Sequence, residues 1–423
     1  MNVLLVPLGS HGDVHPFVGL GLALRARGHR VRVIVNPFFG PLVEQAGLEF
    51  IPLGTTDYYL RMLDNPDLWK PVKGPRAVFA SLAELHRPIY EAVAAHNVPG
   101  DTVMASSILA MGARAAQDKL GIPMATIHLQ PAVFRSTVNA PKLPGMLLGP
   151  WVPAWMIALQ WKVIDTFAID RAIGPSFNAF RKELGLPKVK GFFREYGHSP
   201  RRVIGMFPEW FAPSQPGWPL QTRLTGFPLY DERGLEDQAP DLRKFLDEGE
   251  PPIAFTFGSA MWHAHELLEQ SARACTLLGR RGLLLTRRKE QVPPRLPPGV
   301  KHVEYAPFSE LLPHCAALVH HGGIGTASQA LAAGVPQLVL PHTHDQPDNA
   351  ARLEKLGVGR TLSPKKYRAD RVAQVLADLL GSQRVKESCA AVAKRMAGTN
   401  AMEETCELME ALLQTAAVEA APV

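Results

Sequence analysis

"VHHGGIGTASQALAAGVPQLVLPHTHDQ" occupies residues 319–346 and holds four glycines and four histidines. The run "ALVHH" that leads into it and the run "PQLVLP" inside it are short and apolar, as buried strands are. Between them, "IGTASQALAAG" is expected to form a short helix that stops at Gly334. The stretch therefore predicts strand, glycine loop, helix and strand, the repeating unit of an open parallel sheet.

The same alternation recurs along the chain. "NVLLVPL", "FVGLGLALRARG", "RVRVIV" and "PFFGPLVEQAG" predict strand, helix, strand and helix near the start, and a second series begins at "IAFTFGSA". At 423 residues the chain exceeds the size of one hydrophobic core. We therefore expect an α/β protein of two doubly wound domains facing each other across a cleft. The predicted domains are 1–224 and 241–423, joined by a linker at 225–240, and the last helices could pack back on the first domain.

Composition narrows the class of protein. The net charge of +6 comes from scattered Lys and Arg, which favours an anionic ligand or an anionic membrane surface over nucleic acid, although a solvated charged face accounts for it as well. The four cysteines have neither metal nor disulfide spacing and fit reduced thiols. We find no signal peptide and no apolar run that could cross a membrane, so we expect a cytoplasmic protein.

The segment 131–219 loses the alternation and gathers prolines and tryptophans, including "LPGMLLGPWVPAWMIALQWKVID". It could be ordinary helix and loop that cover one domain. It could also be an apolar acceptor pocket or a surface that touches a membrane. Trp151, Trp155 and Trp161 suggest more apolar surface than a sugar-sized acceptor needs.

The glycine loop at 322–325 predicts an anion site. Its glycines leave backbone N–H groups uncovered at a helix N-terminus, where a pyrophosphate is favoured, and His321 and Thr326 can add side-chain donors. A plain tight turn is the alternative. The loop is neither a Walker motif nor an opening GxGxxG, which argues against a nicotinamide dehydrogenase.

A metal site formed by the nearby histidines is a weaker hypothesis. His320 and His321 are adjacent on a strand and point to opposite faces, so they cannot easily share one ion. His342 and His344 could share a metal, but no HExxH or Cys/His framework supports such a site. We expect no metal.

A second glycine turn, "GSHGDVHP" at residues 9–16, follows the first predicted strand. Ligands of open α/β sheets bind at this position, so Asp13, His11 or His15 could act as a general base. Asp13 could instead cap the following helix. "FTFGS", ending at Ser259, places another small-residue loop at the edge of the second domain.

Together these motifs resemble the GT-B nucleotide-sugar glycosyltransferases of the UDP-glycosyltransferase superfamily. "GSHGDVHPFVGLGLAL" is similar to the opening of sterol and antibiotic glycosyltransferases, and "YAPFSELLPHCAALVHHGGIGTASQALAAGVPQLVLPHTHDQPDNAARL" to their donor-binding signature. With "DNPDLW", "GDTVMASS", "FPEWFAP" and "TGFPLYD", the sequence resembles most closely the rhamnosyltransferases that make rhamnolipids. The resemblance implies an acceptor-binding N-terminal domain and a nucleotide-sugar-binding C-terminal domain.

The resemblance also implies roles for individual residues. Asp13 falls on the position of the catalytic base, with His11 beside it. The positions that contact the donor phosphates are Ser259, His321, Gly323, Gly325 and Thr326. Those that contact the nucleoside are Tyr305, Ala306 and Gln329, and those that contact the sugar are Asp345 and Gln346. Two positions depart from the plant members: Gln329 replaces a Glu that grips the ribose, and Ser106 or Ser107 occupies the region of an Asp that orients a catalytic His.

The implied reaction is an inverting, metal-independent transfer without a cofactor. The donor would be a UDP- or dTDP-linked sugar, such as dTDP-rhamnose, and the acceptor the hydroxyl of a lipophilic molecule, such as a hydroxy-fatty acid. A UDP-glucose-dependent enzyme acting on phenols, flavonoids or sterols is the first alternative. A nucleotide-sugar epimerase would need no apolar acceptor cavity, and a non-catalytic protein that binds sugar nucleotides or lipids would need no Asp13.

Overall fold

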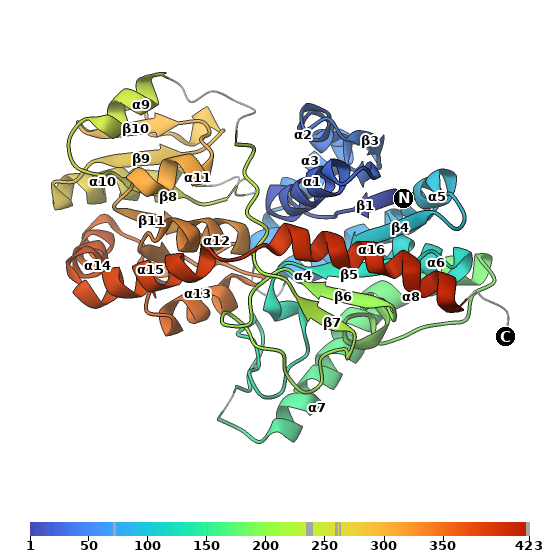
Figure 1. The fold of residues 1–423 in the computed structure, drawn as a ribbon. Coiled ribbons are helices and arrows are strands. Elements are labelled where there is room, and N and C mark those ends of the chain that lie inside the picture. The colour runs from blue at the N-terminus through green and yellow to red at the C-terminus, as the bar shows by residue number, and fades with distance from the viewer. Residues whose placement is uncertain (71–72, 150, 234–239, 259–260, 262–263, 420–423) are drawn as a thin grey trace. The chain divides into compact units, whose positions relative to one another are not determined.

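The computed structural model describes residues 1–70, 73–149, 151–233, 240–258, 261 and 264–419. It divides into two compact units, Met1–Pro228 with Asn400–Val423, and Leu229–Thr399. Each unit is built on its own parallel sheet (Figure 1). The expected fold class, two doubly wound Rossmann-like domains, is confirmed.

The sheet of the first unit has seven parallel strands. The two central neighbours β1 and β4 pair from Asn2 with Thr102 to Val6 with Ser106. All five residues of β1 are buried, because helices cover both faces of a parallel sheet. The strand order is β3 (Glu49–Pro52), β2 (Arg30–Val35), β1 (Asn2–Val6), β4 (Thr102–Ser107), β5 (Met124–His128), β6 (Arg202–Gly205), β7 (Thr222–Leu224).

The helices of the first unit come from both ends of the chain. They are α1 (His11–Ala26), α2 (Gly40–Gln45), α3 (Thr56–Leu63), α4 (Lys73–Ser81), α5 (His86–His96), α6 (Met111–Leu120), α7 (Ala154–Ile164), α8 (Asp170–Glu183) and α16 (Ala401–Glu419). The C-terminal helix α16 packs on α1, where Arg27 donates to Glu410 at 2.8 Å and to Glu403 at 2.7 Å. The chain thus returns to its first unit after completing the second.

The second unit has six parallel strands, ordered β10 (Val300–Val303), β9 (Gly282–Leu285), β8 (Ile253–Thr256), β11 (Ala317–His320), β12 (Gln337–Val339), β13 (Gly359–Thr361). Its helices are α9 (Pro240–Asp247), α10 (His265–Leu278), α11 (Phe308–Leu311), α12 (Ile324–Ala333), α13 (Gln346–Lys355), α14 (Ala369–Gly381) and α15 (Gln383–Met396). Gly279 and Gly334 end α10 and α12 in the left-handed conformation that favours glycine.

Two features differ from the sequence expectation. Helix α1 begins at His11, so most of the "GSHGDVHP" turn is already helical and Pro16 lies inside the helix. Strands β6 and β7 form within and just after the segment that had lost its alternation, because they pair with β5 and with each other and do not depend on an apolar pattern of their own. Within the described part of the chain, no helix is long and apolar enough to span a membrane.

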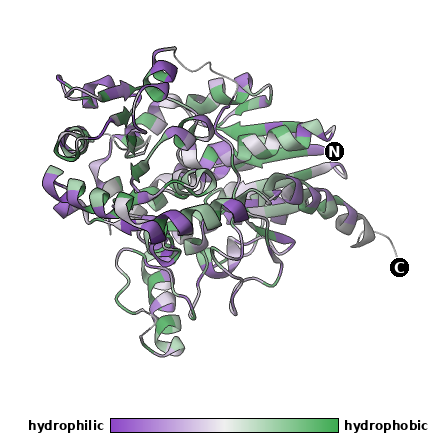
Figure 2. Ribbon diagram, turned by 60° about the vertical axis from the view of Figure 1, so that its left-hand side comes forward, coloured by the Kyte–Doolittle hydropathy of each residue, from purple (hydrophilic) through white to green (hydrophobic). Residues whose placement is uncertain are grey.

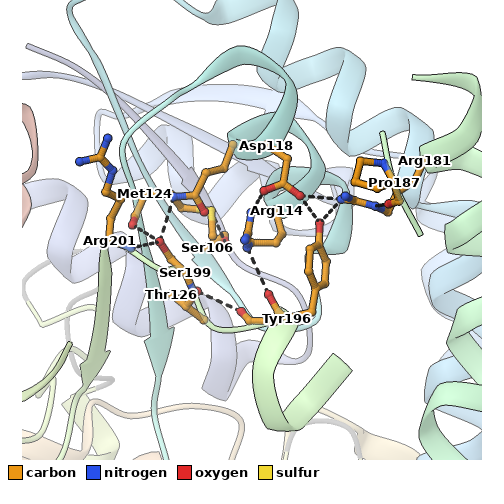
Figure 3. Close-up of polar contacts among 12 residues, drawn as sticks. Ser106, Arg114, Asp118, Met124, Thr126, Arg181, Pro187, Tyr196, Ser199 and Arg201 are labelled. Carbon is orange, nitrogen blue, oxygen red and sulfur yellow. Dashed lines mark hydrogen bonds and ion pairs between the residues drawn. The ribbon is translucent and has the colours of Figure 1, made fainter. Parts of the chain in front are cut away.

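A polar cluster around Asp118 joins α6, α8 and the segment that precedes β6 (Figure 3). The Asp118 carboxylate accepts hydrogen bonds from Arg181 at 2.6 Å, from the Tyr196 hydroxyl at 3.0 Å, and from Arg114. Burial alone would raise the pKa of Asp118, but the charge of Arg114 and these hydrogen bonds together lower it. The carboxylate is therefore a fixed anion that holds three segments together.

Replacing Asp118 should destabilise the chain in a pH-dependent way. Because its folded pKa is depressed, its contribution is full above the unfolded pKa of about 3.9 and is lost as the pH falls through the folded pKa. We expect Asp118→Asn to lower the free energy of unfolding by about 1.5–3 kcal/mol near neutral pH. Urea denaturation across a pH series measures this, and a loss that persists at the lowest pH would contradict it.

The matched control is Asp247→Asn. Asp247 forms an exposed ion pair with Arg243 at 3.4 Å, and exposed pairs contribute at most about 1 kcal/mol. Its effect should be smaller than that of Asp118→Asn near neutral pH.

Candidate active site

Asp13 lies in the first turn of α1, directly after the carboxyl end of β1. Its Oδ2 accepts hydrogen bonds from Ser10 N at 2.8 Å and from Ser10 Oγ at 3.2 Å. Asp13 therefore does cap the helix, as the alternative interpretation proposed. Capping does not exclude a catalytic role, because the contacts to Ser10 both fall on one oxygen of a half-buried carboxylate.

Burial raises the pKa of Asp13 above the ordinary value for an aspartate, although the two hydrogen bonds from Ser10 oppose the shift. Tyr59 lies close enough for electrostatic interaction with Asp13: burial, and after it the charge of Asp13, raises the pKa of Tyr59. The raised pKa makes the Asp13 carboxylate a stronger base than an exposed aspartate.

Gly9 leaves room for this carboxylate. Its φ is +137°, and a methyl group added there would lie 2.2 Å from Asp13 Oδ2. Residues other than glycine rarely adopt this backbone conformation, and any side chain at position 9 would collide with the Asp13 carboxylate. The glycine that opens "GSHGDVHP" therefore positions Asp13.

The other candidates near the first loop lie in different surroundings. The ring of His11 packs at 5.0 Å from Phe39 and at 5.6 Å from both Phe38 and His15. Ser106 is buried and donates to Met124 Sδ at 3.5 Å, and Ser107 ends β4. Neither serine supplies the two hydrogen bonds to Asp13, which both come from Ser10.

In the second unit, β11 ends at His320, and His321 follows directly; the two side chains contact different groups. His320 is fully buried, accepts a hydrogen bond from Gly322 N at its Nδ1, and contacts Gln337 Oε1 through Nε2 at 3.0 Å. These partners place the proton on Nε2. His320 is a structural residue that fixes the start of the glycine loop.

His321 points the other way and packs on glycines. A methyl group at Gly323 would lie 2.5 Å from its Nε2, and one at Gly258 would lie 3.0 Å from its Cε1. Burial, with smaller effects from His320 and His342, lowers the pKa of His321 to about 3. Its buried Nδ1 has no hydrogen-bond partner among the described residues. The side chain is a neutral imidazole that can donate a hydrogen bond to a ligand but carries no charge.

Helix α12 begins at Ile324 with Gly323 as its N-cap, and its first turn contains no acidic residue. A methyl group at Gly325 would meet no atom within 4 Å, so this glycine borders open space. Thr326 is half-buried, and Gln329 is buried one turn further on. The helix start thus offers N–H groups and the positive end of the helix dipole without an anion of its own.

Asp345 and Gln346 lie where α13 begins. Gln346 Oε1 accepts from His342 N at 2.8 Å and Thr343 N at 3.2 Å, which leaves its Nε2 as the donor. Asn349 Nδ2 donates both to Gly322 O at 2.9 Å and to Asp345 Oδ2 at 2.6 Å.

Asn349 thereby ties the glycine loop to the acidic residue, and the sequence pattern alone did not single it out. The available signal was a polar residue four positions after Asp345, on the same face of the helix.

Two of the predicted nucleoside residues, Tyr305 and Ala306, follow β10, whereas Gln329 lies on α12. The Tyr305 hydroxyl donates to Asp231 O at 2.7 Å, and the Arg287 guanidinium lies 4.4 Å from its ring. Ala306 is buried. One face of Tyr305 is thus covered by Arg287, so a base could stack only on the other. Ser259, the remaining phosphate candidate, lies outside the described residues.

In the described part of the chain, the histidines near the loop are not grouped as metal ligands are. The rings of His320 and His321 are 6.3 Å apart and nearly perpendicular. Within the described ranges, no three His, Cys, Asp or Glu side chains group closely enough to hold a metal ion.

Two parallel-sheet units of this kind match the solved structures of GT-B glycosyltransferases. The chain belongs to the glycosyltransferase family and is an enzyme. Residues 3–138 match the glycosyltransferase family 28 N-terminal domain, and residues 283–412 match the C-terminal domain of erythromycin biosynthesis protein CIII-like proteins.

Individual relatives support the same assignment. The chain is 30% identical to O-mycaminosyltylonolide 6-deoxyallosyltransferase of Streptomyces fradiae, over 98% of each chain. It is 30% identical to vancomycin aglycone glucosyltransferase of Amycolatopsis orientalis, over 85% of each. Among solved structures, the glycotransferase of kitacinnamycin has a TM-score of 0.74 at 21% identity, with 97% of this chain and 99% of that chain covered. Spinosyn rhamnosyltransferase SpnG, complexed with thymidine diphosphate, has a TM-score of 0.69 at 18% identity, with 97% and 100% covered.

The contact between Gly9 and Asp13 leads to a prediction. Gly9→Ala should lower the free energy of unfolding by about 1–3 kcal/mol, because the backbone is strained and the new methyl group displaces the carboxylate. Removing the carboxylate in Gly9→Ala/Asp13→Ala should recover part of that loss. Denaturant unfolding of the single and double variants measures the coupling.

Gly12→Ala is the matched control. A methyl group there meets only Ser10 Oγ at 3.7 Å and adds helix propensity, so we expect no loss of stability. Equal losses at positions 9 and 12 would contradict the assigned role of Gly9.

Proposed function

We propose that this enzyme transfers a sugar from a nucleoside diphosphate to a hydroxyl group of a lipophilic natural product, with inversion and without a metal ion. The observation that carries the proposal is Asp13, a carboxylate with a raised pKa at the carboxyl end of β1 in the first unit of a glycosyltransferase. The second unit supplies a helix start without an acidic residue, which suits the donor diphosphate.

The bond changes follow from these groups. The acceptor hydroxyl gives its proton to Asp13 while its oxygen attacks the anomeric carbon from the side opposite the diphosphate. The bond from that carbon to the diphosphate oxygen breaks, and the electron pair leaves with the phosphate. Because an aspartate is a weak base for an alcohol, proton transfer must be late and coupled to departure of the leaving group.

The leaving diphosphate would be stabilised by the start of α12. The N–H groups of Gly325 and Thr326 and the imidazole of His321 would donate hydrogen bonds to the negative oxygens, with Gly323 at the same loop. Ser259 keeps the phosphate contact that the family resemblance implies. His321 remains neutral near pH 7, since its pKa is about 3. The stabilisation is therefore by aligned donors and the helix dipole rather than by a side-chain cation.

The rest of the donor would bind to neighbouring elements. Asp345 and the Nε2 group of Gln346 would hold sugar hydroxyls, oriented by Asn349 and by the turn at His342. Tyr305 and Ala306 would contact the nucleobase, and Gln329 the ribose. Any base that stacks on Tyr305 would use the face that Arg287 leaves open.

Thymidine diphosphate sugars are the preferred donors in this proposal. One structural neighbour is a rhamnosyltransferase complexed with thymidine diphosphate, and the relative that matches 98% of the chain is named a 6-deoxyallosyltransferase of O-mycaminosyltylonolide. A dTDP-deoxyhexose such as rhamnose fits both. The acceptor class includes polyketides and the hydroxy-fatty acids suggested by the resemblance to the rhamnolipid enzymes. The second candidate is glucosylation of phenols from UDP-glucose, and its glucosyl part is supported by the match to vancomycin aglycone glucosyltransferase.

A competition assay tests the proposal. dTDP-rhamnose and UDP-glucose are offered together with a macrolide aglycone, a hydroxyalkanoyl lipid and a flavonoid, and the products are identified by mass. We expect transfer of rhamnose to the macrolide or the lipid, and we expect it to persist in EDTA. Exclusive glucosylation of the flavonoid would select the second candidate, and binding of nucleoside diphosphates without any transfer would indicate a non-catalytic protein.

Asp13→Asn should lower kcat by about a hundredfold or more, because a general base typically contributes ~10²–10⁴. The asparagine Oδ1 can still accept from Ser10 N, so the helix start is retained. In the wild type, kcat should fall as the pH drops through the raised pKa of Asp13, since only the carboxylate accepts the proton.

His11→Ala is the comparison variant, with kcat and the dissociation constant for thymidine diphosphate as the two readouts. It should reduce kcat less than Asp13→Asn does, and both variants should bind thymidine diphosphate as the wild type does. A larger loss from His11→Ala would assign the base to His11.

A further inference from the structure

Helix α7 and the π-helix η5 (Asp165–Ile169) that continues it have one buried face and one exposed apolar face. One face is buried against the first unit and consists of Ile157, Trp161, Asp165 and Ile169. The other face is exposed and consists of Trp155, Leu159, Val163 and Phe167, which we call the α7 stripe. The two sets are offset by two residues, or about 200°, so they lie on opposite sides of the helix.

The α7 stripe is strongly exposed for apolar side chains. Trp155 is 67% exposed and Phe167 68%. Trp151, one turn before the stripe, is 77% exposed, and Leu147 is 83% exposed. The helix projects away from the sheet of the first unit, and its ribbon is largely green in the hydropathy view (Figures 1 and 2). Contiguous exposed apolar residues of this kind mark interaction surfaces.

The stripe is held in place rather than loosely packed. On the buried face, Trp161 Nε1 donates to Ser136 O at 2.9 Å, and Arg135 pairs with Asp165 at 3.0 Å while lying over the Trp161 ring. On the side of the preceding loop, Gln160 Oε1 accepts from Leu147 N at 2.8 Å and Leu148 N at 2.9 Å. These contacts fix both the helix and the apolar loop beside it.

The exposed charges of the segment that carries the stripe have one sign. Between Pro131 and Pro175 the chain has two acidic residues. Asp165 is paired with Arg135, and Asp170 accepts from Gly191 N at 2.9 Å and Phe192 N at 3.1 Å. The exposed charged residues of the same segment, as far as the structure describes it, are all basic: Lys142, Lys162 and Arg171. Among its described residues, the segment that carries the stripe exposes cations but no carboxylate. The stripe and its surroundings therefore complement an anionic surface.

We propose that the α7 stripe docks this enzyme on an anionic lipid surface. Tryptophans at one end and Lys162 within the helix match a helix that lies in the membrane interface, where indole rings sit among headgroups and lysines pair with lipid phosphates. This inference goes beyond the proposed transfer reaction, since docking requires only the described residues of one unit. It also suits a lipophilic acceptor, which partitions into the same membrane.

Vesicle flotation with the full chain tests the proposal. The probes are phosphatidylcholine vesicles with and without phosphatidylglycerol. Wild-type protein should float with the anionic vesicles and much less with the neutral ones, and added salt should weaken the binding. Trp155→Ser/Leu159→Ser should lower vesicle affinity about tenfold or more. Lys162→Gln should lower it about fivefold on anionic vesicles only, since one basic residue contributes about 1 kcal/mol there.

Leu277→Ser is the matched control, because Leu277 is a 63% exposed leucine on α10 of the second unit. Its vesicle binding should equal that of the wild type. Circular dichroism should show that all the variants are folded, as expected for exposed positions.

Flotation of the double variant equal to that of the wild type would overturn the proposal. If the double variant then also changes from dimer to monomer, the stripe is assigned to a second copy of the chain. If it instead loses transfer to a dissolved acceptor, the stripe is assigned to acceptor binding. Flotation does not depend on sugar transfer, so failure of the proposed function would leave this test intact.

Discussion

The N-terminus of a helix that follows a parallel strand has N–H groups with no partner in the helix, and the structure meets this constraint in two ways. At α1, Asp13 of the same turn accepts from Ser10, so the helix start already has its anion. At α12, the first turn has no acidic residue, and Gly325 borders open space. The start of α1 therefore holds the carboxylate of Asp13, which can accept a proton, whereas the start of α12 is suited to the anion of a ligand.

Burial rather than charge sets the chemistry of the second loop. His320 and His321 are adjacent, but their partners differ: His320 bonds Gly322 N and Gln337, whereas His321 lies against Gly258 and Gly323. Burial lowers both pKa values, to about 4 and about 3, so both side chains are neutral near pH 7. A diphosphate at this loop would be held by aligned dipoles, which are already in position before the reaction and need no reorganisation.

Helix α7 shows how one segment can serve the fold and still present an apolar surface. Its buried face depends on the Arg135–Asp165 pair and the Trp161 hydrogen bond, so its position does not depend on the opposite face. The exposed Trp155 and Phe167 are therefore not needed for packing. This separation allows the stripe to be altered without loss of the fold.

The sequence by itself determined the alternation of strands and helices and the two glycine loops, because periodicity and glycine placement are local properties. It therefore predicted the doubly wound class and the position of Asp13 after the first strand. Only the tertiary structure decided which of the similar tryptophans is buried, since Trp155 and Trp161 differ only in what packs against them. It also decided that β6 and β7 pair, that Gly9 makes room for Asp13, and that Asn349 joins Gly322 to Asp345. Contacts made through space between turns or sheet neighbours leave no periodic pattern along the chain, which is why sequence reasoning did not find them.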